Sequence, residues 1–483
     1  MTMMKRCRQN NLISMMNKAC FKYILLSLLL AGLIQSCKVA KPYQQPDLNL
    51  NDLYRGQTTS DTTTIANMPW QNLFTDTVLK ALILEGLYQN LDLKTAVQKI
   101  EEAQAALGQA KGALLPNLSA NAGAARSKQS AAALNLAPGT EISTLTTTYQ
   151  LGLSASWEAD IWGKLSSSKR AAYANLLQTD AAKRAIQTRL IADIANNYYN
   201  LLALDKELAI TTQTLQNRIK DVETMKTLKE AAIVNGAAVV QSEANRYAAE
   251  VAIPDIKRSI RETENALDIL LARQPGPLNR GKLDEQRPIT ELQTGLPSQL
   301  LKNRPDIQQA EYSFRSAFEN TNVAHAYFYP SFTITAAGGY SNLQLKDFFV
   351  NSIFYNIAAG LTQPIFNQDI NKSRLKTAQA QQKEALYNYQ QTLLTAGAEV
   401  SNALYSYQSA LEKDGARSKQ IIALQKAVDY TQELLRYSSA TNYTDVLTSE
   451  QSLLAAQLNG VNDRLQQLQA IVNLYRALGG GWK

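Results

Sequence analysis

The chain has 483 residues, of which 45% are hydrophobic and 19% are charged, a balance typical of folded proteins. The formal net charge is +8, but five basic residues lie before residue 37, and without them the net charge is +3, which gives little support to nucleic-acid binding. The only cysteines are Cys7, Cys20 and Cys37, so a disulfide framework or a thiolate metal site is excluded after residue 37.

The N-terminal segment is typical of a secreted lipoprotein. A basic region that ends at Lys22 precedes the apolar run YILLSLLLAGLI, which is too short to cross a bilayer comfortably and suits a secretory signal. The run ends in LIQSC, which resembles the lipobox of bacterial lipoproteins. We therefore expect residues 1–36 to be a lipoprotein signal peptide and Cys37 to be acylated. The alternative is an ordinary signal peptide with an incidental cysteine.

The next segment is extended, and long helices follow it. Residues 37–73 are predicted to form a lipid-anchored arm, because they are rich in polar residues and proline and have no sustained period. From Trp70 onward the pattern is helical, and the helix from about Leu165 to Val234 would have about 70 residues and span roughly 100 Å. Coiled-coil seams are predicted where apolar residues alternate spacings of three and four or recur every seven residues. The seam residues are Ile194, Leu201, Leu208 and Leu215, then Leu386, Tyr389, Leu393, Ala396, Val400, Ala403, Tyr407 and Ala410, then Leu454, Leu458, Val461, Leu465, Leu468, Val472 and Tyr475.

Two pairs of amphipathic strands interrupt the helices. From Tyr149 to Glu158, in YQLGLSASWE, apolar and polar side chains alternate, as in a strand with one apolar face. Each strand has about 9 to 11 residues, the length that crosses a bilayer when tilted. A soluble sheet is the alternative. The expected strands are residues 117–126, 149–159, 331–340 and 352–362.

The chain repeats one unit. LLPNLSANAGAARS at 114–127 corresponds to FYPSFTITAAGGYS at 328–341, and equivalent features further along are also offset by about 210 residues. We infer a duplicated unit of helix, strand, strand, long helix and helix. The expected segments are a first repeat at 74–273, a linker at 274–296, a second repeat at 297–478 and a C-terminal tail at 479–483.

Four strands cannot close a barrel by themselves. In lipid, each unpaired backbone group of an open sheet edge costs several kcal/mol, so other copies of the chain must close the barrel. Three copies would supply twelve strands and twelve helical segments. Aromatic residues near the strand ends are candidates for the membrane-interface girdle. These candidates are Tyr149, Trp157, Trp162, Tyr340 and Tyr355.

Four motifs resemble those of one family. They are SWEADIWGK at 156–164, GLPSQLLKNRPDIQQAE at 295–311, QPIFN at 363–367 and VNLYRALGGGW at 472–482. With the two-fold repeat, they look like the lipoprotein branch of the TolC-like outer-membrane factors, and the resemblance covers nearly everything after Cys37. It implies a mainly α protein with a membrane β-barrel part. The family's homotrimeric duct has a 12-stranded β-barrel in the outer membrane of a Gram-negative bacterium and a 12-helix α-barrel in the periplasm.

The resemblance also implies a function. It points to the exit duct of a tripartite efflux pump, which passes small molecules such as drugs from an inner-membrane transporter and a periplasmic adaptor to the exterior. A duct for type I protein secretion is the alternative, and a structural coiled-coil envelope lipoprotein is less favoured. A periplasmic adaptor would have one helical hairpin flanked by compact β domains, and not a duplicated unit with strand pairs.

No enzymatic, cofactor or metal site is expected. His325 is the only histidine, and no catalytic triad, paired-carboxylate context or phosphate loop stands out. Only Met68 and Met225 follow Cys37, which disfavours a copper or silver duct lined by thioether ligands. The motif at 295–311 is expected to shape the fold, because Arg304-Pro305-Asp306 interrupts a helix and restarts it.

The second helix turn, residues 437–450, is the candidate periplasmic gate, with residues 234–243 as its counterpart. An outer-membrane duct must constrict until a partner engages it. The family places its constriction at this turn, often with an Asp held by a basic partner, but Thr448 and Ser438 stand at the matching positions. We therefore expect packing and neutral hydrogen bonds to hold most of the closed state. A plain helix turn without a gating role is the alternative. The gate candidates are Tyr437, Tyr443, Thr444, Asp445 and Thr448, and three copies of Asp445 would form an acidic ring.

Overall fold

The computed structural model describes residues 39–48, 53–55, 62–130, 143–287, 292–437 and 443–483. The predicted signal peptide, Cys37 and Ser438 lie outside these residues. The chain divides into two compact units. The sheet unit comprises the described residues of Met1–Pro46, Ala103–Leu176 and Ser313–Ala385, and the hairpin unit comprises those of Asp47–Glu102, Leu177–Tyr312 and Leu386–Lys483.

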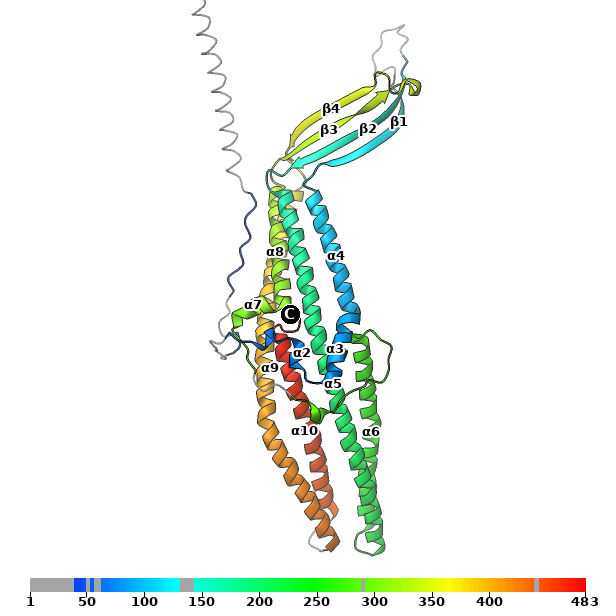
Figure 1. Ribbon diagram of the computed structural model, residues 1–483, viewed down its shortest axis with the longest axis vertical. Coiled ribbons are helices and arrows are strands. Elements are labelled where there is room, and N and C mark those ends of the chain that lie inside the picture. The colour runs from blue at the N-terminus through cyan, green and yellow to red at the C-terminus, as the bar shows by residue number, and fades with distance from the viewer. Residues whose placement is uncertain (1–38, 49–52, 56–61, 131–142, 288–291, 438–442) are drawn as a thin grey trace, which may run out of the picture. The chain divides into compact units, whose positions relative to one another are not determined.

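The main helices have matching lengths in the two halves of the chain (Figure 1). Helices α4 (Leu91–Gly112) and α8 (Pro305–Ala326) have 22 residues each. Helix α5 (Lys164–Glu230) has 67 residues and α9 (Ile370–Tyr437) has 68. Helices α6 (Gly236–Leu270) and α10 (Tyr443–Ala477) have 35 each. The equal lengths in the same order support a duplicated unit.

Shorter helical elements precede the main helices or lie between the main elements. The short helices are α2 (Trp70–Leu73), α3 (Thr77–Gln89) and α7 (Leu300–Asn303), and the 3-10 turns are η1 (Ile65–Asn67), η2 (Leu283–Glu285), η3 (Pro297–Gln299) and η4 (Leu345–Asp347). Among the described residues, no helix combines the length and apolar composition needed to cross a membrane. The division into arm, repeats, linker and tail stays a prediction.

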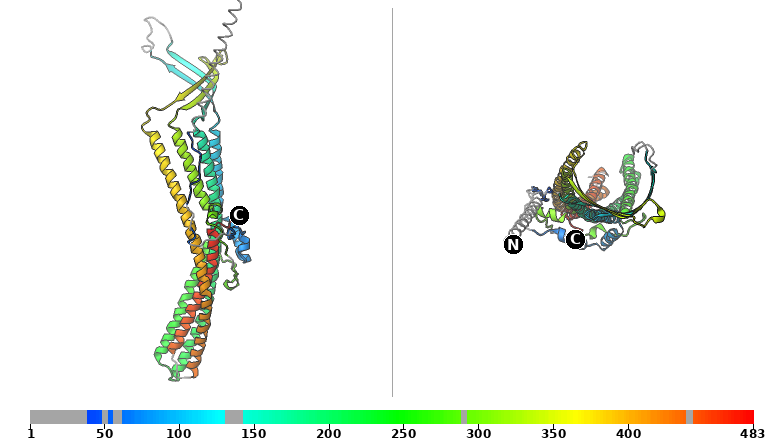
Figure 2. Two further views of the ribbon diagram at one scale, coloured as in Figure 1. Left: turned by 90° about the vertical axis from the view of Figure 1, so that its left-hand side faces the viewer. Right: turned by 90° about the horizontal axis from the view of Figure 1, so that it is seen from above.

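The sheet unit contains one antiparallel sheet in the order β1-β2-β3-β4. Its strands are β1 (Asn117–Lys128), β2 (Leu145–Ala159), β3 (Ser331–Asn342) and β4 (Ile353–Thr362). Strand β2 pairs with β3, so the strands of the two halves of the chain form one continuous layer. Figure 2 shows that this layer is curved.

The register of the sheet separates apolar from polar side chains. Residues directly opposite each other in paired strands place their side chains on the same side of the sheet. Leu118 pairs with Ala155, Leu153 with Gly338, and Ala336 with Ile357. The apolar face therefore contains Leu118, Ala120, Ala122 and Ala124 of β1, Tyr149, Leu151, Leu153, Ala155 and Trp157 of β2, Phe332, Ile334, Ala336, Gly338 and Tyr340 of β3, and Ile353, Tyr355, Ile357, Ala359 and Leu361 of β4. The predicted alternation is confirmed in all four strands.

The opposite face, called the polar face below, carries hydroxyl and amide side chains. Ser119 and Ser154 lie across β1 and β2 with their hydroxyl oxygens 3.0 Å apart, and the Asn121 amide donates to the Ser154 hydroxyl at 3.0 Å. Asn356 of β4 lies on this face as well, because it is the neighbour of Ile357. Phe354 is the large apolar residue on this face.

Helix α5 begins directly after β2 because Asp160 caps it. The two carboxylate oxygens of Asp160 accept hydrogen bonds from the backbone N–H groups of Leu165 and Ser166, each at 2.8 Å. A carboxylate at this position pairs N–H groups that have no partner within the helix, and it is favoured by the helix dipole. The change from strand to helix is thus fixed locally by the sequence ADIWG.

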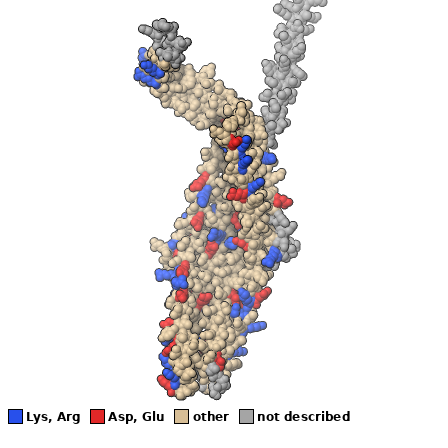
Figure 3. Space-filling view, turned by 180° about the vertical axis from the view of Figure 1, so that it is seen from behind, with Lys and Arg blue, Asp and Glu red and all other residues tan. Residues whose placement is uncertain are grey.

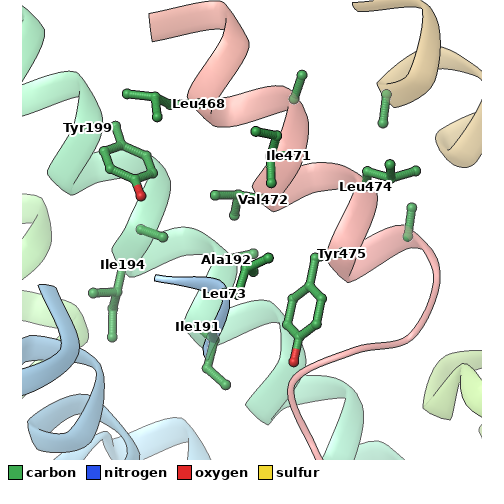
Figure 4. Packing of buried hydrophobic residues seen from close by; sticks show 14 of the residues in the cluster. Leu73, Ile191, Ala192, Ile194, Tyr199, Leu468, Ile471, Val472, Leu474 and Tyr475 are labelled. Carbon is green, nitrogen blue, oxygen red and sulfur yellow. The ribbon is translucent and has the colours of Figure 1, made fainter. Parts of the chain in front are cut away.

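The core of the hairpin unit includes residues of all three predicted seams. Ile194 and Leu201 of α5 are fully buried, as are Tyr389, Ala396 and Val400 of α9. Figure 4 shows how α5 and α10 meet in this core, with Leu73 of α2 packed beside them. The α10 residues in this contact are Leu468, Ile471, Val472, Leu474 and Tyr475. The spacing of three and four therefore predicted the buried side of these helices.

Two of the sequence motifs pack on each other in the hairpin unit. The Arg304 guanidinium donates to Asp306 at 2.5 Å, to Glu399 at 2.7 Å and to the Ala477 carbonyl at 2.9 Å. The Trp482 indole N–H donates to the carbonyl oxygen of Asn303 at 2.9 Å. The motif at 295–311 thus holds the C-terminal tail against the start of α8, in agreement with its expected structural role.

The first described part of the arm lies against α8 in the sheet unit. Asn322 accepts a hydrogen bond from the Lys41 backbone N–H at 3.2 Å and donates one to the Lys41 carbonyl at 3.0 Å. The Tyr43 ring contacts Phe314 and Phe318 edge-on, with centroids 5.9 and 5.7 Å away. Residues 39–48 form no helix or strand, whereas η1 and α2 lie within the arm expected at 37–73.

Candidate functional site

The apolar face of the sheet is the candidate membrane surface. The four strands contain only Arg126, Lys128 and Glu158 as charged residues. Figure 3 shows this contrast, because Lys, Arg, Asp and Glu are spread over the helices while the strands are almost bare of them except at one end. Leu153, Ile357 and Leu361 on this face are 55%, 73% and 65% exposed. Large apolar side chains with such exposure indicate a surface that contacts another apolar phase.

The sheet is open at both sides within the described residues. Strand β1 pairs only with β2, and strand β4 pairs only with β3. The outer backbone groups of β1 and β4 therefore have no strand partner within the described part of one chain. Open edges of this kind are a template for pairing with a further strand.

Two of the predicted girdle residues lie where the strands meet the helices. The Trp157 indole N–H donates to the Leu114 carbonyl at 2.9 Å, and the Trp162 indole N–H donates to the Pro330 carbonyl at 2.6 Å. Trp162 also stacks on Tyr329, with ring centroids 5.0 Å apart. Indole groups with an apolar ring and a paired N–H suit the border between lipid and water.

The other predicted girdle residues lie on the opposite half of the strands. Tyr149 pairs with Asn342 and Tyr340 with Ile353, close to the ends of β2, β3 and β4 that lie away from the helices. Tyr355 is 83% exposed on the apolar face. The structure thus separates the five residues into two groups at different levels of the sheet.

Sequence reasoning missed the aromatic run Tyr327-Phe328-Tyr329 at the end of α8. The three side chains are part-exposed, and the Tyr329 ring stacks on Trp162. The Arg374 guanidinium lies 3.8 Å and the Lys164 ammonium 5.1 Å from the centroid of the Tyr327 ring. Three aromatic residues directly before a predicted strand were a usable signal for the girdle.

At the other end of the long helices, the two helix turns are packed together by a small apolar cluster in the hairpin unit. Met225 of α5, Val239 of α6, and Tyr443 and Leu447 of α10 form its buried centre. Asn235 starts α6 by accepting a hydrogen bond from the Ala238 N–H at 3.2 Å. This tip cluster, defined by the four buried residues, ties the α5–α6 hairpin to α10.

A buried charged contact lies next to the tip cluster. Arg218 of α5 forms an ion pair with Glu450 of α10, and Gln432 of α9 donates to Glu450 at 2.9 Å. Asp221 lies one turn along α5, 3.9 Å from the Arg218 guanidinium. Burial and the neighbouring Glu450 carboxylate raise the pKa of Asp221 to about 7, although Arg218 acts in the opposite direction. A charged contact thus adds to the packing and neutral hydrogen bonds expected from the sequence.

The gate candidates occupy different environments. Tyr437, the last residue of α9, is 85% exposed, whereas Tyr443, the first residue of α10, is 6% exposed within the tip cluster. Thr444, Asp445 and Thr448 are exposed on the first turns of α10. The Thr448 hydroxyl donates to the Thr444 carbonyl at 2.8 Å. The structure therefore brings Tyr443 into the packing between hairpins and leaves the others on the surface.

A cleft of about 660 Å³ lies between α5, α9 and α10 in the hairpin unit. Its walls combine apolar residues such as Val428, Leu435 and Val446 with the charged residues Arg218 and Glu450. Residues of the charged contact and of the tip cluster therefore line the same cleft, which has both apolar and polar walls.

The histidine and methionine candidates occupy buried or partly buried positions. No group of three or more His, Cys, Asp or Glu side chains that could hold a metal ion occurs within the described residues. His325 lies in the last turn of α8 and is half-buried. Met225 is buried in the tip cluster, and Met68 is part-buried beside the main core.

Comparison with known proteins identifies the family. The sequence profile described as "outer membrane efflux protein" matches residues 82–273 and 296–480. The chain belongs to this family. The toluene efflux pump outer membrane protein TtgF of Pseudomonas putida is 30% identical, over 95% of this chain and 96% of that protein. The probable outer membrane lipoprotein SilC of Salmonella typhimurium is 29% identical, over 96% of this chain and 99% of that protein.

A solved structure agrees with the assignment to the outer membrane efflux protein family. The open state of the Neisseria gonorrhoeae outer membrane channel MtrE matches 92% of this chain and 99% of that chain, with 28% identity and a TM-score of 0.81. The predicted TolC-like fold class is confirmed. The chain is an outer-membrane efflux channel of a Gram-negative bacterium, with its helical part in the periplasm. Family members are channels and not enzymes, and they work with adaptors and inner-membrane pumps.

Proposed function

We propose that three copies of the chain form one closed channel and serve as the exit duct of a tripartite efflux pump. The observation that carries this proposal is the amphipathic four-stranded sheet, whose edges β1 and β4 are open within the described residues. Each unpaired backbone group in lipid costs several kcal/mol, so β4 of one copy pairs with β1 of the next. Twelve strands then close a barrel with the apolar faces toward lipid and the polar faces toward the bore.

Apolar stripes on two helices support the same assembly. On α6, Val240, Tyr247 and Val251 are more than half exposed and are spaced by seven and four residues. On α9, Tyr430 and Leu434 are exposed with a spacing of four. Such spacing is typical of a coiled-coil seam whose partner is missing. In the proposed trimer, helices of neighbouring copies cover these stripes and close the α-barrel.

The assembly is tested with the full-length protein in mild detergent. We expect native mass spectrometry to give the mass of three lipid-modified chains, and planar bilayers with this material to show discrete single-channel conductance. A monomeric protein that gives no conductance after reconstitution would contradict the proposal.

We propose that the cargo consists of small molecules handed over by an inner-membrane transporter and a periplasmic adaptor. The relative TtgF is named for a toluene efflux pump, which supports small organic cargo. The position of both remaining methionines in packed regions gives no thioether lining for soft metal ions. Type I secretion of a polypeptide is the second candidate.

The cargo is tested by deletion. Loss of the gene should increase sensitivity to several drugs, organic solvents or detergents, and the wild-type gene should restore resistance. Unchanged sensitivity together with a block in the export of one protein would favour the secretion duct instead.

We propose that acyl chains on Cys37 anchor the mature protein. The LIQSC sequence and the description of the relative SilC as a probable lipoprotein support this. Several acyl chains together give a stable anchor, because each buried methylene contributes about 0.8 kcal/mol. Wild-type protein and the Cys20→Ser variant should incorporate a radioactive fatty acid, and Cys37→Ser should not. Equal labelling of all three would refute acylation at Cys37.

We propose that the turn between α9 and α10 forms the periplasmic gate. Tyr437, Thr444, Asp445 and Thr448 supply its exposed side chains, whereas Tyr443 supplies packing against the α5–α6 hairpin. The charged contact of Arg218 with Glu450 holds the same two hairpins together. Engagement of the adaptor is expected to separate them.

A further inference from the structure

The connection between β3 and β4, residues 343–352, carries large apolar side chains on its surface. Leu345 is 65%, Phe349 is 69% and Val350 is 60% exposed. This β3–β4 loop lies at the end of the sheet away from α4 and α8 (Figure 1). A surface loop gains nothing from exposing such residues to water, so a cluster of them indicates contact with an apolar phase.

The loop is fastened to the apolar face of the sheet. The Asn342 amide donates to the carbonyl oxygens of Asp347 at 2.6 Å and Val350 at 3.3 Å. Asn342 lies on the apolar face, because it is directly opposite Tyr149 in the β2–β3 pairing. The loop backbone is therefore held on the side of the sheet that faces away from the polar side chains.

Aromatic contacts also hold the loop on the apolar side of the sheet. The Tyr340 ring, which lies on the apolar face opposite Leu151, meets Phe349 edge-on with centroids 5.2 Å apart. Tyr340 also contacts Phe348 at 6.3 Å, and the two phenylalanine rings lie 5.0 Å from each other. The loop thus continues the apolar face beyond the last strand pairs.

Two cations of β1 lie at the same end of the sheet, where the β3–β4 loop also carries Lys346 and Asp347. Arg126 and Lys128 follow Ala124 on the apolar face of β1, and Lys128 pairs with Leu145, four residues beyond the level of Tyr149. Figure 3 shows a patch of Lys and Arg at this end of the strands. Apolar side chains followed by cations match the order of acyl chains and phosphate groups in a lipid leaflet.

We propose that the β3–β4 loop is a membrane-embedded anchor that inserts Leu345, Phe349 and Val350 into the acyl chains of the adjoining lipid leaflet. This inference rests on the proposed placement of the sheet as the wall of a barrel. The loop cannot cover the bore while Asn342 holds it, because the tether lies on the lipid side of the wall. The partner is lipid, since the apolar surface is continuous with the face that contacts lipid.

The loop position is tested by spin labelling of the full-length trimer. The chain has no cysteine after Cys37, so a single introduced cysteine reports one site. Phe349→Cys and Val350→Cys are labelled and reconstituted in phosphatidylcholine vesicles, and collisions with oxygen and with a water-soluble nickel chelate are measured. We expect both labels to be accessible to oxygen and shielded from nickel, as for Ile357→Cys on the apolar face. Asn356→Cys on the polar face should show the opposite.

Failure of the loop anchor and failure of the proposed sheet placement give different results. If the loop labels collide with nickel as often as the Asn356→Cys label, or are shielded from both reagents by protein, the anchor is overturned while Ile357→Cys still reports lipid. If the Ile357→Cys label is accessible to nickel, the placement of the sheet fails and the anchor fails with it. Adding Asn342→Ala to Phe349→Cys removes the tether and should raise nickel accessibility several-fold. No change would overturn the role of Asn342. Size-exclusion chromatography confirms that each variant is a trimer.

Discussion

Asp221 and Glu450 place two carboxyl groups beside one guanidinium group, that of Arg218. Two neighbouring carboxylates disfavour each other's charge, so the pair retains a proton to higher pH than either group in water. Gln432 donates to Glu450 from α9, and the Tyr443 hydroxyl lies within the electrostatic reach of all three groups. If α5 and α10 separate, Asp221 returns to water, where its ordinary value is 3.8.

We predict that the periplasmic end opens more easily as pH rises from about 4 to about 7. The pKa of Asp221 is higher in the closed contact than in water, so the closed contact binds this proton more tightly, and the protonated Asp221 favours closure. The stability of the closed contact falls as pH rises from about 4 to about 7. The open probability in planar bilayers should rise over this range by at most about tenfold per pH unit for each titrated chain.

Matched variants test the origin of this pH dependence. Asp221→Asn cannot titrate and should give an open probability that hardly changes with pH. Asp255→Asn removes an exposed carboxylate of α6 and should behave like the wild type. The prediction is wrong if Asp221→Asn keeps the wild-type pH dependence.

A second prediction concerns Gly479 at the end of the chain. Its φ is +87°, and an added Cβ would lie 2.5 Å from the Asn303 carbonyl oxygen. Gly479→Ala should destabilise the protein by about 1–2 kcal/mol or more, because it combines a left-handed backbone with a backbone clash. Gly108→Ala, in the interior of α4 with open space around its Cβ, should be neutral or stabilising by up to about 1 kcal/mol. Thermal unfolding followed by circular dichroism compares them, and equal midpoints would contradict the clash.

At the scale of elements, the residues of the gate turn have two different environments. Tyr443 is packed in the tip cluster, whereas Tyr437 and Asp445 are exposed. Tyr443→Ala should remove a ring from the tip cluster at a cost of about 3–5 kcal/mol, as for other large-to-small core substitutions, and should increase the open probability.

Tyr437→Ala should widen the exit without weakening the hairpin contact, because Tyr437 is 85% exposed. Asp445→Ala should lower the cation preference. Conductance and ion selectivity of the three trimers test this, and wild-type behaviour of all three would place the gate elsewhere.

Local periodicity predicted the elements well because each element is amphipathic by itself. The seams through Ile194, Leu201 and Val400 and the strand around Tyr149 all follow from spacing alone. Strand β2 begins at Leu145, earlier than expected, since Thr146, Thr147 and Thr148 pair with β1. β-branched residues favour strands, and this signal was available in the sequence.

Contacts between distant segments could not be predicted in this way. Arg218 and Glu450 are 232 residues apart, and no local pattern connects them. The buried position of Tyr443 had a local signal, because Leu447 follows four residues later on the same side of the helix. The tether from Asn342 to the β3–β4 loop depends on backbone geometry that side-chain patterning does not report.

At the scale of the whole molecule, the described part of a single chain does not close its sheet into a barrel. Its sheet has two open edges within the described residues, and large apolar side chains of β1, β2 and β4 are exposed on its apolar face. A soluble monomer with such a surface would aggregate, whereas a barrel in lipid satisfies both the edges and the apolar face. Adjacent residues of one strand therefore face lipid and water in turn, and they should respond oppositely to the same substitution.

The last prediction uses this alternation in the middle of β4. Ile357→Arg puts a cation on the apolar face, which should cost about 2–4 kcal/mol in each chain near the bilayer midplane. Asn356→Arg puts the same side chain on the polar face one residue away, where water solvates it. We expect trimer in the outer-membrane fraction to fall strongly for Ile357→Arg and to stay near the wild-type amount for Asn356→Arg, which should instead reduce cation conductance. Quantitative immunoblotting of membrane fractions measures the first effect. Equal loss of both variants would show that strand pairing, and not the facing of the side chains, limits assembly.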